Sequence, residues 1–171
     1  MVHNEFTFTD ANFGVVRITA SQAHDEISVT GEQVPDCGLR RTSTKPDRPD
    51  VPIGTRNGAE LVITLSGQTG SVSPAPGKYT RGSYRVDALC GGSSYRFEPS
   101  SPTASRLMVN GTVLGEILVH ERRPDHASWE PVARPQDVAM GYLLAAAFGA
   151  GARRMLGLVL EGLFNAESSP L

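Results

Sequence analysis

The residue types that could do chemistry in this chain are four histidines, two cysteines and the carboxylates beside them. His24 precedes Asp25 and His120 precedes Glu121, which are pairs that serve in acid–base catalysis or metal binding. Neither a His-x-x-x-His nor a Cys-x-x-Cys spacing accompanies them, so we interpret both pairs as surface turns. The sequence predicts no catalytic residue, no metal site and no cofactor. A triad assembled from distant residues stays an open alternative.

The two cysteines say more about the cellular compartment of the protein than about any catalytic reaction. Cys90 lies in phase with Tyr84 and Val86, so we expect it to be a small buried side chain, and we expect Cys37 to be the more reactive thiol. Two cysteines are too few for a disulfide framework, which favours a reducing compartment. A bridge between the two stays open. The N-terminus has no basic region followed by an apolar run, so we expect a cytoplasmic protein.

A stretch without periodicity, residues 34–58, contains four prolines among charged and small residues. We expect a long mobile loop here, and such loops are often functional. Its arginines make it locally basic, so Arg40 and Arg41 are candidates for binding an anion or a partner. A solvated insertion is the alternative. Trp129, which precedes Glu130, is expected either to cover one end of the fold or to line a ligand pocket.

Length and charge limit the classes of function. The chain has 171 residues and a formal net charge of −2, which suits one domain, residues 1–171, with a core of its own. Nucleic-acid binding is not expected, because it calls for clustered lysines and arginines on a basic domain.

The elements that would position these residues are mostly strands. Apolar residues alternate with polar ones through residues 5–30, which predicts three antiparallel strands. Asn110-Gly111 between two apolar runs predicts a type I′ hairpin turn. We expect about eight strands in total, nearly all paired with their neighbours in the sequence. Beyond the first three, they are expected over residues 60–66, 84–90, 95–98, 107–120 and 129–132.

One long apolar stretch, residues 137–164, predicts a helix with Asp137 as its N-cap. Residues 138–152 carry no charge, and a helix that is apolar on every face is buried. The uncharged run falls short of the about 20 apolar residues that span a bilayer, so we expect a core helix and no transmembrane segment. One side of this helix is nearly flat, because small residues recur there at Gly141, Ala145 and Gly149. Such a side allows either close packing of another segment or a cavity.

Many local strands followed by one apolar helix predict a mainly β fold. We expect an antiparallel β-barrel, or a strongly curved sheet, that encloses the hydrophobic helix. An alternative is that the helix pairs between subunits.

Two stretches of the chain are similar to the tubby C-terminal-like group, which includes tubby proteins, phospholipid scramblases and LURP-one-related proteins. They are the hairpin from Arg106 to Val119, with its Asn110-Gly111 turn, and the segment Pro135 to Met140 that leads into the apolar run. The resemblance covers about the last two thirds of the chain. It implies a closed barrel around a central helix and a non-enzymatic module that binds anionic lipid head groups.

The resemblance also suggests binding residues. The tubby phosphoinositide site uses a lysine and an arginine on adjacent strand positions, and the nearest candidates in this chain are Lys78, Arg81 and Arg85. Lys78 and Arg81 fall in an expected loop, which departs from that pattern, and the calcium and palmitoylation features of scramblases are not visible. We therefore expect a module that binds anionic lipid or a protein partner through its loops. The alternative is a small barrel enzyme or carrier with an apolar cavity.

Overall fold

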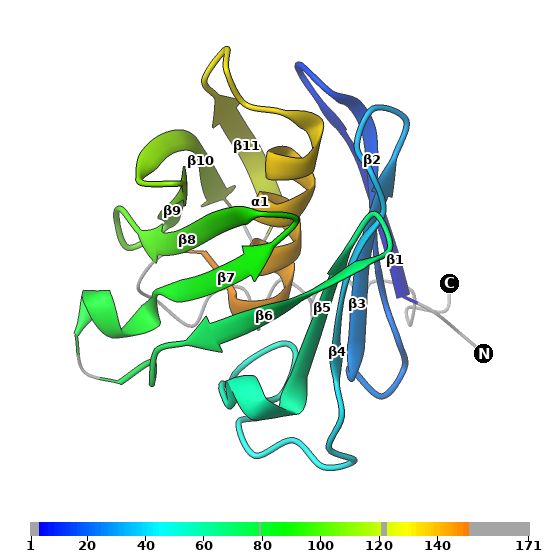
Figure 1. Ribbon diagram of the computed structural model, residues 1–171, viewed down its shortest axis with the longest axis vertical. Helices are drawn as coiled ribbons and strands as arrows, with labels where there is room; N and C mark the ends of the chain where they lie inside the picture. The colour runs from blue at the N-terminus through cyan, green and yellow to red at the C-terminus, as the bar shows by residue number, and fades with distance from the viewer. Residues whose placement is uncertain (1–3, 79, 121–122, 151–171) are drawn as a thin grey trace, which may run out of the picture.

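The computed structural model describes residues 4–78, 80–120 and 123–150. Within them, eleven strands form one sheet in which each strand pairs antiparallel with the next one in the sequence. The sheet curves into a nearly closed barrel around one α-helix (Figure 1). This confirms the predicted mainly β fold with an enclosed helix. The strands are β1 (Asn4–Asp10), β2 (Gly14–Ala20), β3 (Glu26–Gly31), β4 (Cys37–Arg41), β5 (Leu61–Leu65), β6 (Gln68–Pro74), β7 (Val86–Cys90), β8 (Ser93–Pro99), β9 (Ala104–Val109), β10 (Thr112–His120) and β11 (Arg123–Trp129), and the helix is α1 (Pro135–Phe148).

The strands follow the alternation that the sequence displays. Ile27 and Val29 in β3 are buried while their neighbours are not, and the same holds for Tyr95 and Phe97 in β8. The predicted hairpin turn is confirmed between β9 and β10, where Asn110 has φ 49° and its following glycine has φ 85°. These positive φ values match the twist of two paired strands.

Strand β4 falls in the stretch that we expected to be a loop, and β6 falls where we expected no strand. Strand β4 lies inside residues 34–58, and its inward positions are Cys37, Leu39 and Arg41. Because the third of these inward positions is an arginine and not an apolar residue, the alternation of β4 is not visible in the sequence. Strand β6 exposes most of its side chains and buries only Val72, so it has no apolar alternation to recognise.

The last strand also differs from expectation. Residues 129–132 were expected to form a short strand, but β11 ends at Trp129. The chain then turns, and the amide of Ala133 donates to the carbonyl of Glu130 at 2.9 Å. The described residues thus hold eleven strands instead of about eight.

Helix α1 begins two residues before the predicted N-cap. Arg134 is the N-cap, Pro135 takes the first helical position, and Asp137 occupies the third. The carboxylate of Asp137 accepts a hydrogen bond from the Arg134 amide at 3.0 Å, so it still caps the helix. The helix ends at Phe148, and the part predicted over residues 151–164 lies outside the described residues. No described helix has the length and apolarity needed to span a bilayer.

The helix joins the two ends of the barrel. Its start follows β11 and the turn that contains Glu130. Near its last turn, the carbonyl of Ala147 accepts a hydrogen bond from the amide of Ile53 at 3.1 Å. A 14-residue helix is about 21 Å long. Loop 42–57, which this hydrogen bond ties to the last turn, therefore lies about that far from the start of the helix.

Candidate functional site

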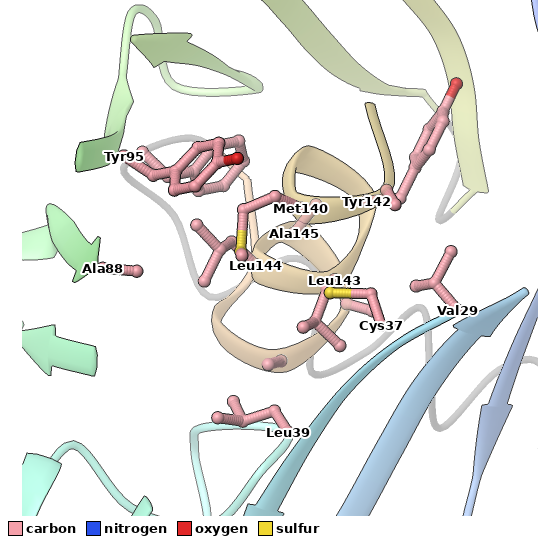
Figure 2. Packing of buried hydrophobic residues seen from close by; sticks show 14 of the residues in the cluster. Val29, Cys37, Leu39, Ala88, Tyr95, Met140, Tyr142, Leu143, Leu144 and Ala145 are labelled. Carbon is pink, nitrogen blue, oxygen red and sulfur yellow. The ribbon is translucent and has the colours of Figure 1, made fainter. Parts of the chain in front are cut away.

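Helix α1 occupies the barrel interior. Eleven of the 14 residues of α1 are buried, with Met140 on the side of Tyr95 and Leu143 on the side of Cys37 (Figure 2). The covering residues come from the chain's own strands, so the apolar helix is not at the surface. A pocket of about 150 Å³ lies outside the barrel and is lined by Thr19, Ser21, Glu26 and Ser28.

A buried carboxylate lies where the sheet edges meet. Asp10 ends β1 and is 4% exposed. One of its oxygens accepts from the amides of Asn12 and Phe13 at 2.8 and 3.0 Å, and the other accepts from Trp129 Nε1 at 2.9 Å and from the Tyr142 hydroxyl. Because β1 and β11 are the edge strands, these bonds fasten the open seam of the barrel through side chains.

Trp129 is packed into this seam against the helix. A Cβ on Gly115, which faces Trp129 across β10 and β11, would lie 2.2 Å from the indole ring, and a Cβ on Gly141 would lie 2.8 Å from it. The ring also meets Tyr142 edge to face, with centroids 5.6 Å apart. The flat side of the helix thus provides close packing for this indole, which supports the first of the two expectations for its small residues.

A second polar group closes the start of the helix. Asp137 is fully buried and accepts from the Tyr95 hydroxyl at 3.3 Å and from the Arg134 side chain at 3.2 Å. The same guanidinium donates to the Ser93 hydroxyl at 3.2 Å. Within the described residues, no buried side-chain nitrogen or oxygen lacks a partner. These polar groups are therefore arranged to hold the fold together.

The two buried tyrosines predict a loss of stability in alkali. Burial raises the pKa of Tyr95 to about 12, and burial together with the hydrogen bond to Asp10 raises that of Tyr142 further. Their stabilising contribution is complete below pH 10, the unfolded value, and is lost as the pH rises toward the folded value. We expect the free energy of unfolding of the wild type, relative to Tyr142→Phe, to fall by about 1.4 kcal/mol per pH unit above pH 10.

Urea denaturation at pH 9, 10, 11 and 12 measures this difference. Cys37, whose pKa burial raises to about 12, acts in the same direction, and Arg56, whose pKa burial lowers to about 10, acts in the opposite one. Both are present in the two proteins, so the comparison isolates Tyr142. A constant difference from pH 9 to pH 12 would contradict the prediction.

The opposite end of the barrel is built around a buried arginine. Arg41 ends β4 and is 3% exposed. Its Nε donates to the carbonyl of Ile53 at 2.9 Å, and its Nη1 donates to the carbonyl of Ser43. These bonds fold loop 42–57 back on itself, and two residues of the loop, Val51 and Ile53, are buried. The loop therefore has a packed interior, in contrast to the alternative of a solvated insertion.

Arg56 is the second buried arginine at this end. It is 9% exposed, and it donates to the carbonyls of Ala75 at 2.6 Å and Arg85 at 3.3 Å. Its guanidinium lies over the rings of Tyr84 and Phe148, at 6.0 and 5.6 Å from their centroids. Neither Arg41 nor Arg56 forms an ion pair with another described residue.

The same end of the barrel also carries exposed cations. We call this region, which consists of loops 42–57 and 75–85 together with Arg40 and Arg41, the basic end. Arg40 points outward from β4, while Lys45, Lys78 and Arg81 are exposed on the loops. These four side chains form no ion pair in the described part of the chain, whereas Arg85 pairs with Asp87 at 3.5 Å.

The structure thus separates the sequence-predicted site residues into two groups. The cationic candidates all lie at the basic end, although Arg41 is buried and binds carbonyls. Trp129 lies beside the middle of the helix, where its ring meets Tyr142 and where a Cβ on Gly141 would lie 2.8 Å from it. Sequence reasoning missed Asp10 and Arg56, since neither has a local motif. Arg56 lies between the polar residues Thr55 and Asn57, so the sequence around it held no signal of burial.

The other chemical candidates lie apart. The described residues contain no group of three or more histidine, cysteine or acidic side chains that could hold a metal ion. Cys37 is buried and free, which corrects the expectation of a reactive thiol, because β4 turns it into the core and burial raises its pKa to about 12. Cys90 is also buried and free, as its alternation predicted.

No protein-family model, curated protein or solved structure matches this chain. The similarity to the tubby C-terminal-like group therefore rests on the hairpin and on the helix start alone.

Proposed function

We propose that this protein is a non-enzymatic binding module of the tubby-like kind, which docks on an anionic lipid surface through its basic end. The observation that carries the proposal is the grouping of charge at that end. Arg41 and Arg56 are buried there without an ion pair to any described residue, and the loops at this end and β4 carry exposed cations that also lack such a pair.

The two buried arginines increase the positive electrostatic potential of this end, because the charge of a buried group is poorly screened by water. In surroundings of low dielectric constant the field of a charge extends further than it does in water. Since the net charge of the chain is −2, attraction to an anionic surface depends on orientation, with this end facing the surface. The cytoplasmic location expected from the sequence fits the anionic lipids of the cytoplasmic leaflet.

The buried position of the helix supports a binding module over the alternative of a carrier. Val138, Met140 and Leu143 are fully buried in the space where a carried molecule would lie. Binding would then depend on the outer surface. Because the apolar residues of loop 42–57 are buried, the contact we propose is electrostatic and involves little insertion into the bilayer.

We expect the protein to bind vesicles of phosphatidylcholine with phosphatidylserine, and to bind phosphatidylcholine vesicles much more weakly. The triple variant Lys45→Gln, Lys78→Gln, Arg81→Gln should reduce binding about a hundredfold, since each cation near such a surface contributes about 1 kcal/mol. Co-sedimentation at 50 and 200 mM salt is the measurement, and binding should weaken at the higher salt concentration.

The matched control removes the same number of charges from the outer sheet surface. Arg17, Arg96 and Arg106 are exposed there and pair with Glu5, Asp87 and Glu98 respectively. Their glutamine variants should bind as the wild type does. Equal losses in both triple variants, or wild-type binding that ignores lipid charge, would contradict lipid docking. If the wild type ignores vesicles but binds an acidic protein through the same three cations, the partner is a protein.

A further inference from the structure

Arg56 connects segments that lie far apart in the sequence. The residue belongs to loop 42–57, its two hydrogen bonds reach the carbonyls of Ala75 and Arg85, and its guanidinium stacks on Phe148 at the end of α1. One side chain thus contacts both loops of the basic end and the helix.

The second loop is shaped around this guanidinium. A Cβ on Gly77 would lie 2.9 Å from both Cδ and Nε of Arg56, and this glycine has φ +70°, a conformation that side chains disfavour. A second link runs beside it, because Arg48 donates to the carbonyl of Pro76 at 2.8 Å. The two loops therefore contact each other through arginine and carbonyl groups.

We infer that Arg56 is a positioning residue for anion binding. It holds loops 42–57 and 75–85 in one arrangement, so that Lys45 and Arg81 face a surface together. At 9% exposure, Arg56 cannot itself reach a ligand. The part of this inference that concerns the ligand rests on the proposed function, whereas the coupling of the two loops does not.

Amide hydrogen exchange tests the coupling without a ligand. In loop 42–57 the amide of Ile53 bonds to Ala147, and in loop 75–85 the amides of Ala75 and Gly77 bond to Arg85 and Ser83. In Arg56→Met, all three amides should exchange about tenfold faster, because local opening sets their rates. Arg17→Met, an exposed arginine on β2, is the control and should leave them unchanged. Faster exchange in one loop only, or in neither, would overturn the coupling.

Gly77→Ala provides a second variant in case Arg56→Met does not fold. It keeps the arginine and displaces its guanidinium from the other loop, so the same three amides should exchange faster. Unchanged exchange in this variant would also count against the coupling.

Vesicle binding tests whether the position of Arg56 matters or only its charge. Arg56→Met should bind phosphatidylserine vesicles about tenfold more weakly, within the range of coupling between linked positions. Arg56→Lys keeps a charge but lacks the planar fork that reaches two carbonyls, so it should not restore binding. If Arg56→Lys binds like the wild type while all three amides exchange fast, the positioning role is overturned. If the wild type does not bind vesicles, the proposed function and the ligand role fail together, and the exchange result alone decides the coupling.

Discussion

Asp10→Ala should lower the free energy of unfolding by about 3 to 5 kcal/mol, because each buried donor left without a partner costs about 1 to 3 kcal/mol. The substitution leaves the Trp129 indole N–H and the Tyr142 hydroxyl without their common acceptor, and it also releases the turn at Asn12. Urea denaturation followed by tryptophan fluorescence is the measurement, since Trp129 is the only tryptophan in the chain.

Asp36→Ala is the matched control, because Asp36 has an exposed side chain in the loop between β3 and β4. It should change stability by less than about 0.5 kcal/mol. In a Tyr142→Phe background the cost of Asp10→Ala should shrink, since one donor has already been removed. A loss below about 1 kcal/mol for Asp10→Ala in the wild-type background would contradict the role of this carboxylate in closing the seam.

Gly115→Ala is expected to cost about 3 kcal/mol or more, at the upper end of overpacked cores. The new Cβ would lie 2.2 and 2.5 Å from two ring atoms of Trp129 and 3.0 Å from the carbonyl of Ser128. The ring cannot move away without breaking its hydrogen bond to Asp10. Thermal denaturation by circular dichroism measures the loss.

Gly82→Ala provides the comparison, because a Cβ there meets nothing within 4 Å, and its effect should be close to zero. Trp129→Leu removes the ring that causes the clash. Gly115→Ala should therefore cost less in a Trp129→Leu background than in the wild type. If the two costs are equal, the indole is not the source of the strain.

Periodicity in the sequence was sufficient to predict the parts of the fold that depend on residues close together in the chain. The alternation in β3 and β8, the Asn110-Gly111 turn and the uncharged run of α1 each record a local physical preference. Their agreement predicted a barrel around a helix. Burial of Cys90 followed from the same alternation.

What could not be predicted depends on contacts between distant residues. Asp10 lies 119 residues from Trp129 and 132 from Tyr142, so only closure of the barrel brings them together. In the sequence Arg41 resembles a solvent-facing charge, and only the fold shows that a carbonyl of loop 42–57 accepts its hydrogen bond. At the candidate site, the sequence indicated a basic region, but it could not tell the exposed Arg40 from the buried Arg41.

The order of the strands has a consequence for how the chain reaches its native state. Every strand pairs with the next one along the chain, so the sheet can grow by successive hairpins with little entropy lost to loop closure. The core of the barrel, however, is α1, which follows the eleven strands of the described residues. A chain emerging from the ribosome must therefore carry the apolar inner face of its sheet uncovered until residues 135–148 arrive, and during that interval it is most open to aggregation or to capture by a chaperone.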